Sequence, residues 1–159
     1  MNIIREKILN GNQALSQIIS QFLPQLRGKI NDANLMWLAC ELQGFQNTLT
    51  YYKNGDPSLP PFRTVAGILR VVNTNAEYAP LNHPFAQRTH FFISSPLSWI
   101  EEALQQQQGD YVLVELPDLT TMFKLPNQIV VCECTKAELS KILYNVRLKF
   151  LDLADEVVK

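Results

Sequence analysis

The longest regular pattern of apolar and polar residues in this chain runs from Thr135 to Lys159. Its apolar residues recur at three- and four-residue steps, which places them on one stripe of a helix. The stripe consists of Leu139, Ile142, Leu143, Val146, Phe150, Leu153 and Val157. Thr135 and Glu138 have the spacing of a capping box, in which each side chain satisfies an unpaired amide of the first turn. The pattern predicts a long C-terminal helix with a marked start.

This helix has a second apolar group outside the main stripe. At about 100° per residue, Tyr144, Leu148 and Leu151 fall together on another face. Either the N-terminal helices of the chain cover this face, which we favour, or it contacts a second chain. Arg147 lies at the edge of the main stripe, where its stem can pack while its guanidinium reaches solvent or an acceptor.

Apolar residues at helical spacing also fill the N-terminal part of the chain. A short helix is expected to end near Asn10-Gly11, and the pattern resumes from Gln13 to Leu26. Pro24 lies within this second stretch and should end or kink the helix, because it has no amide hydrogen to donate. The periodicity leaves open whether residues 1–26 form one bent helix or two.

A third helix is predicted over Ala33–Gln43, with Asn31 or Asp32 as its N-cap. Its apolar residues surround the whole circumference, so we expect it to be largely buried. Gly44 follows directly, where a residue that accepts positive φ can turn the chain.

The middle of the chain has short β-branched or alternating runs separated by prolines and glycines, a pattern typical of strands. Strands are expected over Thr64–Val72, His90–Ile93, Tyr111–Leu116 and Gln128–Cys134. Gly67 suggests a bulge in the first of them. Ser95-Pro96 offers an N-cap and a first helical residue, which predicts a further helix over Pro96–Gln107. The segments 51–63 and 73–87 hold many turn residues and are expected to be irregular.

These elements predict an α+β fold that is predominantly α. N-terminal helices and a long C-terminal helix pack with a small β-sheet or hairpins, and 159 residues fit a single domain over 1–159. The formal net charge of -1 gives no general field for nucleic acid, which disfavours nucleic-acid binding. There is no apolar run of the roughly 18 residues that a membrane span needs, and no signal-peptide block at the N-terminus. We therefore expect a cytoplasmic protein with no membrane association.

Cysteines and histidines do not form a metal-binding pattern. Cys132 and Cys134 alternate onto one strand face, without the two-residue spacer of zinc knuckles, and are expected to be packed thiols. His83 and His90 have no matching cysteine pair. The chain also lacks a Gly-rich phosphate loop and a nucleophile elbow, so we expect no metal, no cofactor and no catalytic residues.

Glu41 is the one acid within the apolar third helix. A carboxylate in such surroundings is costly unless it is paired, so it should either point out of the core or meet an arginine. Arg63 and Arg147 both flank apolar runs and are the candidate partners. A catalytic acid would need further partners, and no histidine or second carboxylate lies near Glu41 in the sequence.

Three short motifs follow one another in a fixed order along the chain. They are Trp37 with Glu41-Leu42 and Gly44-Phe45, then Pro61-Phe62-Arg63, and then Ile142-Leu143 with Val146-Arg147. In order and spacing, from about Leu15 to Leu153, they resemble the AbiTii domain family of bacterial abortive-infection and other conflict systems. The chain departs from that pattern at Phe45 and Phe62, where tyrosine is commoner, and so lacks the hydroxyl groups of those tyrosines.

The resemblance implies a small α-rich domain that accompanies effector or sensor modules in multidomain relatives. We accordingly expect a non-enzymatic protein-interaction or adaptor module of a bacterial anti-phage system. Its partner would be a separate effector protein or a second copy, giving a homodimer. The expected motif or interaction residues are Trp37, Glu41, Gly44, Phe45, Phe62, Arg63, Tyr144, Arg147, Leu148 and Leu151. The alternative is a hydrolase or nuclease that uses Glu41 with Arg63 or Arg147.

Overall fold

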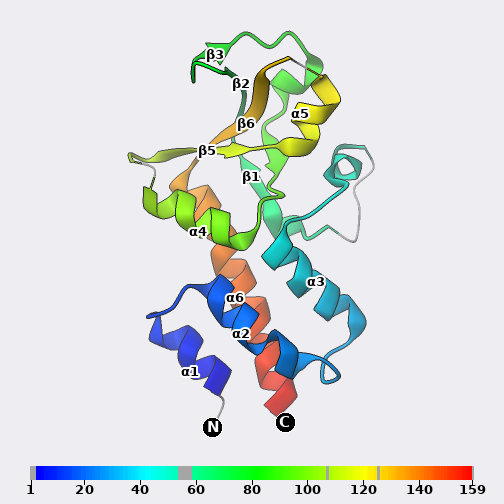
Figure 1. The fold of residues 1–159 in the computed structure, drawn as a ribbon, viewed down its shortest axis with the longest axis vertical. Helices are drawn as coiled ribbons and strands as arrows, with labels where there is room; N and C mark the ends of the chain where they lie inside the picture. Colours follow the sequence, from blue (N-terminus) through cyan, green and yellow to red (C-terminus); the bar gives the residue numbers. More distant parts are fainter. Residues whose placement is uncertain (1–2, 54–58, 107, 125, 159) are drawn as a thin grey trace.

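The computed structural model describes residues 3–53, 59–106, 108–124 and 126–158, and it has the expected α+β architecture. The N-terminal helices gather at one end of the molecule, and the β-strands, with one short helix beside them, lie at the other (Figure 1). The C-terminal helix α6 (Lys136–Val158) starts beside the sheet and runs down among the other helices. Both chain ends lie at the helical end.

The N-terminal part forms separate helices, which settles the question that periodicity left open. They are α1 (Ile3–Asn10), α2 (Leu15–Leu26) and α3 (Asp32–Gln43). Pro24 does not end α2, which continues to Leu26, because a proline near the last turn disturbs few helical hydrogen bonds. Asn31 caps α3 by accepting a hydrogen bond from the Asn34 amide at 2.8 Å.

The expectation that α3 is largely buried was wrong for most of its circumference. Only Trp37, Leu38 and Glu41 are buried, and Met36 is 70% exposed. The helix therefore presents a single narrow face to the core. Its apolar composition led us to expect that other elements cover more of its surface than they do.

Helix α6 follows its predicted stripe closely. Leu139, Ile142, Val146 and Phe150 are fully buried, and α6 contacts α1, α2 and α4 (Leu97–Gln106). The Thr135 hydroxyl accepts a hydrogen bond from the Glu138 amide at 3.1 Å, as expected for an N-cap. The Glu138 carboxylate accepts instead from the Ala66 amide and from Lys141, so it ties the start of α6 to a neighbouring strand.

The strands form two antiparallel sheets. The smaller pairs β1 (Thr64–Ala66) with β4 (His90–Phe92). The larger has the order β3-β2-β6-β5, with β2 at Ile68–Asn73, β3 at Tyr78–Ala79, β5 at Tyr111–Glu115 and β6 at Gln128–Thr135. The inner face of this sheet is buried and contains Cys132 and Cys134, which confirms them as packed thiols.

Two parts of the middle segment differ from expectation. The predicted strand Thr64–Val72 is divided at Gly67 into β1 and β2, which belong to different sheets, so Gly67 is not a bulge within one strand. The segment after β5 contains a short helix, α5 (Pro117–Phe123), that no pattern indicated. Gln107, where the predicted helix Pro96–Gln107 ends, and residues 54–58 inside the segment 51–63 that was expected to be irregular lie outside the described residues.

Candidate functional site

The motif residues of α3 and of the 3-10 turn η2 (Pro61–Arg63) converge on one buried ion pair. Glu41 and Arg63 are both 0% exposed and form a salt bridge between the Arg63 Nη2 and the Glu41 Oε1. Of the two arginines that the sequence offered, Arg63 is therefore the partner. The prediction that Glu41 pairs with Arg63 or Arg147 is thus confirmed with Arg63 as the partner, and Arg147 lies exposed on α6.

Each polar group of the pair has further partners. The Trp37 indole N–H donates to Glu41 Oε2 at 2.9 Å, and the Arg63 Nε approaches the same oxygen at 3.5 Å. The Arg63 Nη1 donates to the carbonyls of Ile93 at 3.0 Å and Ser95 at 2.5 Å. These charge-assisted bonds offset the cost of desolvation and tie α3 and η2 to the segment that leads into α4.

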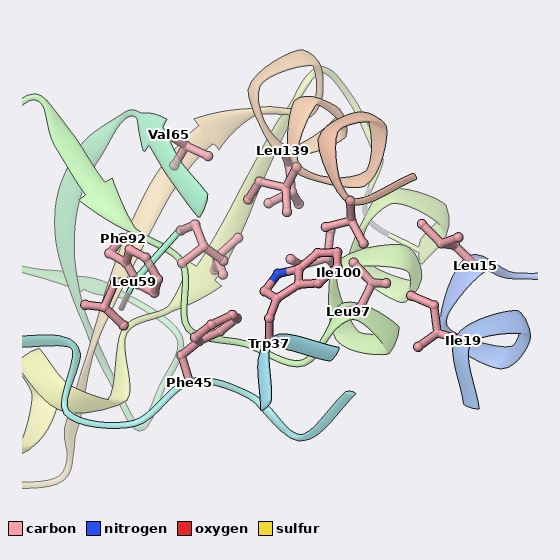
Figure 2. Packing of buried hydrophobic residues seen from close by; sticks show 14 of the residues in the cluster. Leu15, Ile19, Trp37, Phe45, Leu59, Val65, Phe92, Leu97, Ile100 and Leu139 are labelled. Atoms are coloured by element: carbon pink, nitrogen blue, oxygen red, sulfur yellow. The ribbon is translucent and has the colours of Figure 1, made fainter. Parts of the chain in front are cut away.

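Aromatic side chains enclose the pair. The Phe45 ring centroid lies 4.9 Å from the Arg63 Cζ, and Phe62 packs edge-on against Trp37 at 6.4 Å. Figure 2 shows Trp37 and Phe45 among the core residues, with Leu97 and Ile100 of α4 close to the indole. These contacts use ring faces and edges, so the phenylalanines at positions 45 and 62 need no hydroxyl group.

Gly44 has a steric reason for its place in the motif. Its φ is +96°, and a Cβ there would lie 3.1 Å from the Ser94 carbonyl oxygen. This close approach allows the Phe45 amide to donate to that same oxygen at 2.9 Å. The first two motifs together therefore form a buried latch, defined here as Trp37, Glu41, Gly44, Phe45, Phe62 and Arg63.

The latch has the geometry of a structural element. A catalytic acid must reach its substrate within hydrogen-bonding distance, whereas Glu41 has no exposed surface and both its oxygens are occupied by Arg63 and Trp37. The Lys149 Nζ of α6 lies 4.1 Å from the centroid of the Trp37 ring. Its partial burial there lowers the pKa of the ammonium group, opposed by the negative charge of Glu41.

The second face of α6 is only partly covered by the chain itself. Leu151 packs against the core, but Tyr144 is 60% and Leu148 43% exposed. Helix α1 reaches the C-terminal end of α6, where Arg5 pairs with Asp155 at 2.8 Å. The prediction that N-terminal helices cover this face was therefore wrong for Tyr144 and Leu148, which we call the helix face.

A larger apolar surface, which sequence reasoning missed, lies on the outer side of the four-stranded sheet. The strand register places its members on one side, since Val72 lies opposite both Ile129 and Tyr78, and Glu133 lies opposite both Ile68 and Leu113. Its exposed residues, which we call the sheet face, are Ile68, Tyr78, Tyr111, Leu113 and Ile129. Alternation in β6 indicated the side of Ile129, but only the register shows that exposed residues gather there.

Charged side chains cross the sheet face between these apolar residues. The Arg70 Cζ lies 4.9 Å from the Tyr78 ring, and its Nη2 is 3.7 Å from a Glu133 carboxylate oxygen. The Tyr78 hydroxyl donates to Glu133 at 2.7 Å, which raises the pKa of Tyr78. A surface with both apolar area and fixed polar groups is typical of protein interfaces.

Within the described residues, no group of three or more His, Cys, Asp or Glu side chains is arranged to hold a metal ion. A hydrogen bond with Cys134, together with burial, raises the pKa of the Cys132 thiol. No helix in the described part of the chain is long and apolar enough to span a membrane.

Comparisons with known proteins assign no relative. No protein family model, no curated protein and no solved structure matches the chain.

Proposed function

We propose that this chain is a non-enzymatic adaptor of a bacterial anti-phage system, as its resemblance to the AbiTii domain implies. An adaptor joins two molecules and therefore needs two separate contact surfaces. The observation that supports this role is that large apolar residues stay exposed on the helix face and on the sheet face. Exposed apolar patches of this kind usually mark contacts between proteins.

The two surfaces suit different partners. Helix α6 starts beside the sheet, and Leu148 lies about 18 Å along the helix from that start. The helix face and the sheet face are therefore far enough apart for each to bind a different partner. A single exposed helix stripe suits a second copy of the chain, because a two-fold axis uses the same patch twice. The broader sheet face, with its ordered Arg70 and Glu133, is the surface for the separate effector protein.

The alternative of a hydrolase or nuclease built on Glu41 receives no support from the geometry. It would require Glu41 to leave Arg63 and Trp37 and to become accessible to a substrate. Cleavage of nucleic acid that disappears in Glu41→Gln, with the fold retained, would reverse this assignment.

Two matched double substitutions separate the surfaces. Tyr144→Glu/Leu148→Glu alters the helix face, and Leu151 is left unchanged because it belongs to the core. Ile68→Thr/Ile129→Thr removes apolar area from the sheet face while keeping β-branched residues in the strands. Static light scattering should give a dimer for the wild type and the sheet-face variant, and a folded monomer for the helix-face variant.

The effector contact is tested in bacteria that carry the chain together with its neighbouring genes. The number of phage plaques should be higher with the sheet-face variant than with the wild type, although the variant still forms dimers. Unchanged protection by the sheet-face variant would show that this surface binds no effector. A wild-type monomer in solution would refute self-association.

A further inference from the structure

A groove lined by aromatic and basic residues lies where the 3-10 turns η1 (Thr48–Tyr52) and η3 (Pro84–Gln87) meet α5. It consists of two hollows of about 520 Å³ each, which share Phe85 and Met122 as a common wall. Volumes of this size are usual for small-molecule sites. The groove shares no lining residue with the helix face or the sheet face, so it calls for a separate explanation.

The first hollow is lined by Arg88, whose guanidinium is held in place by contacts within the chain. The Arg88 Nη2 donates to the Tyr52 carbonyl at 2.9 Å, and the Arg88 Cζ lies 5.0 Å from both the Tyr52 and the Phe85 rings. A ligand that pairs with this guanidinium would pay little of the usual entropy for ordering it. Lys53 lines the same hollow and brings a second positive charge. The described residues that line this hollow include no carboxylate that would compete with an anionic ligand for these two cations.

The second hollow is lined by three aromatic rings and has a polar edge. The His83 ring stacks on Phe85 at 5.4 Å, and Phe123 lies 4.6 Å from His83. The His83 Nδ1 accepts a hydrogen bond from the Phe85 amide at 3.1 Å, which fixes the orientation of the ring. Asn82 also lines this hollow, and its side-chain amide is both a donor and an acceptor.

We propose that this groove binds a nucleotide. The phosphate lies against Lys53 and Arg88, because a phosphate monoester carries nearly two negative charges and the hollow supplies two positive ones. The base occupies the neighbouring hollow, where ring walls suit its flat faces and Asn82 suits its hydrogen-bonding edge. This inference goes beyond the adaptor function and does not depend on it.

The test is isothermal titration calorimetry of the full chain with AMP, GMP, CMP and UMP, and with inorganic phosphate and adenosine as separate arms. At least one mononucleotide should bind more tightly than inorganic phosphate and than adenosine. Lys53→Gln and Arg88→Gln should each weaken that binding by about 10- to 100-fold, the range for loss of a hydrogen bond to a charged group. Arg147→Gln, which removes an exposed arginine on α6, should leave it unchanged.

Three results would overturn the proposal. The first is the absence of binding by all four mononucleotides at about 1 mM. The second is equal nucleotide binding by the wild type and both groove variants. The third is binding of inorganic phosphate as tight as that of any nucleotide, which would remove the base from the site. Circular dichroism checks that both variants are folded, and Lys53 is an exposed residue, so Lys53→Gln removes no buried side chain.

Discussion

Glu41 is the residue whose removal should destabilise the protein most directly. Glu41→Ala leaves the Arg63 guanidinium buried without its counter-charge, and the free energy of unfolding should fall by about 3–5 kcal/mol. The matched control is Arg5→Ala, which breaks the half-exposed pair with Asp155 and should cost less than about 1 kcal/mol. Urea denaturation measures both, and equal losses in the two variants would show that the buried latch contributes no more than a surface pair.

Tyr52 links stability to alkaline pH. Its hydroxyl oxygen accepts the Phe92 amide hydrogen at 3.0 Å, and burial raises its pKa from 10.0 to about 12. The folded state therefore favours the neutral phenol, and the stability it contributes is complete below pH 10 and is lost as pH rises toward 12. The loss should approach about 2–3 kcal/mol. Unfolding free energies at pH 9 and 11 should differ less in Tyr52→Phe, and an equal difference would contradict this assignment.

The pairing of Glu41 was predictable because it follows from the cost of burying a charge, which is a local property. The choice between Arg63 and Arg147 was not, because it depends on which side of α6 faces α3. Arg147 lies only at the edge of the buried stripe, and Lys149 is the α6 residue that meets Trp37. The hydrogen bonds from Arg63 to the Ile93 and Ser95 backbone carbonyls were not predictable either, because they do not depend on the identity of the side chains at those positions.

At the scale of elements, helices with caps and a clear apolar period were predictable. The Thr135 cap and the Leu139 to Phe150 stripe place α6 within a residue of its observed start. Helix α5 was not predicted because it has seven residues and only Leu119 is buried, so its sequence shows no helical period of apolar residues. The strand division at Gly67 was not predicted because it depends on pairing with two distant strands, β1 with β4 and β2 with β6.

Gly67 should not tolerate a side chain. A Cβ there would lie 2.6 Å from the Cys132 Sγ and 2.7 Å from the Glu133 carbonyl oxygen. We expect Gly67→Ala to lower the unfolding free energy by about 1–3 kcal/mol, the usual cost of overpacking. Adding Cys132→Ala should recover only part of this loss, because the backbone oxygen remains. Thermal denaturation compares the three proteins, and an unaltered melting temperature in Gly67→Ala would show that the close approach to β6 tolerates a methyl group.

For the whole molecule, the sequence did not predict which apolar surfaces stay exposed after folding. Tyr144 and Leu148 have the same spacing as core residues, and only the extent of α1 shows that they stay exposed. The sheet face requires the register of four strands. Both surfaces depend on how distant segments are placed, which local patterns do not encode.

Self-association through the helix face should also appear in thermal stability. If folded chains pair and unfolded chains do not, mass action raises the melting temperature with protein concentration. We therefore expect the melting temperature of the wild type and of Ile68→Thr/Ile129→Thr to increase over a hundredfold range of concentration. For Tyr144→Glu/Leu148→Glu it should stay constant, because two facing glutamate pairs would replace an apolar contact by repulsion. A melting temperature that is constant in the wild type, or that rises equally in all three proteins, would exclude pairing through Tyr144 and Leu148.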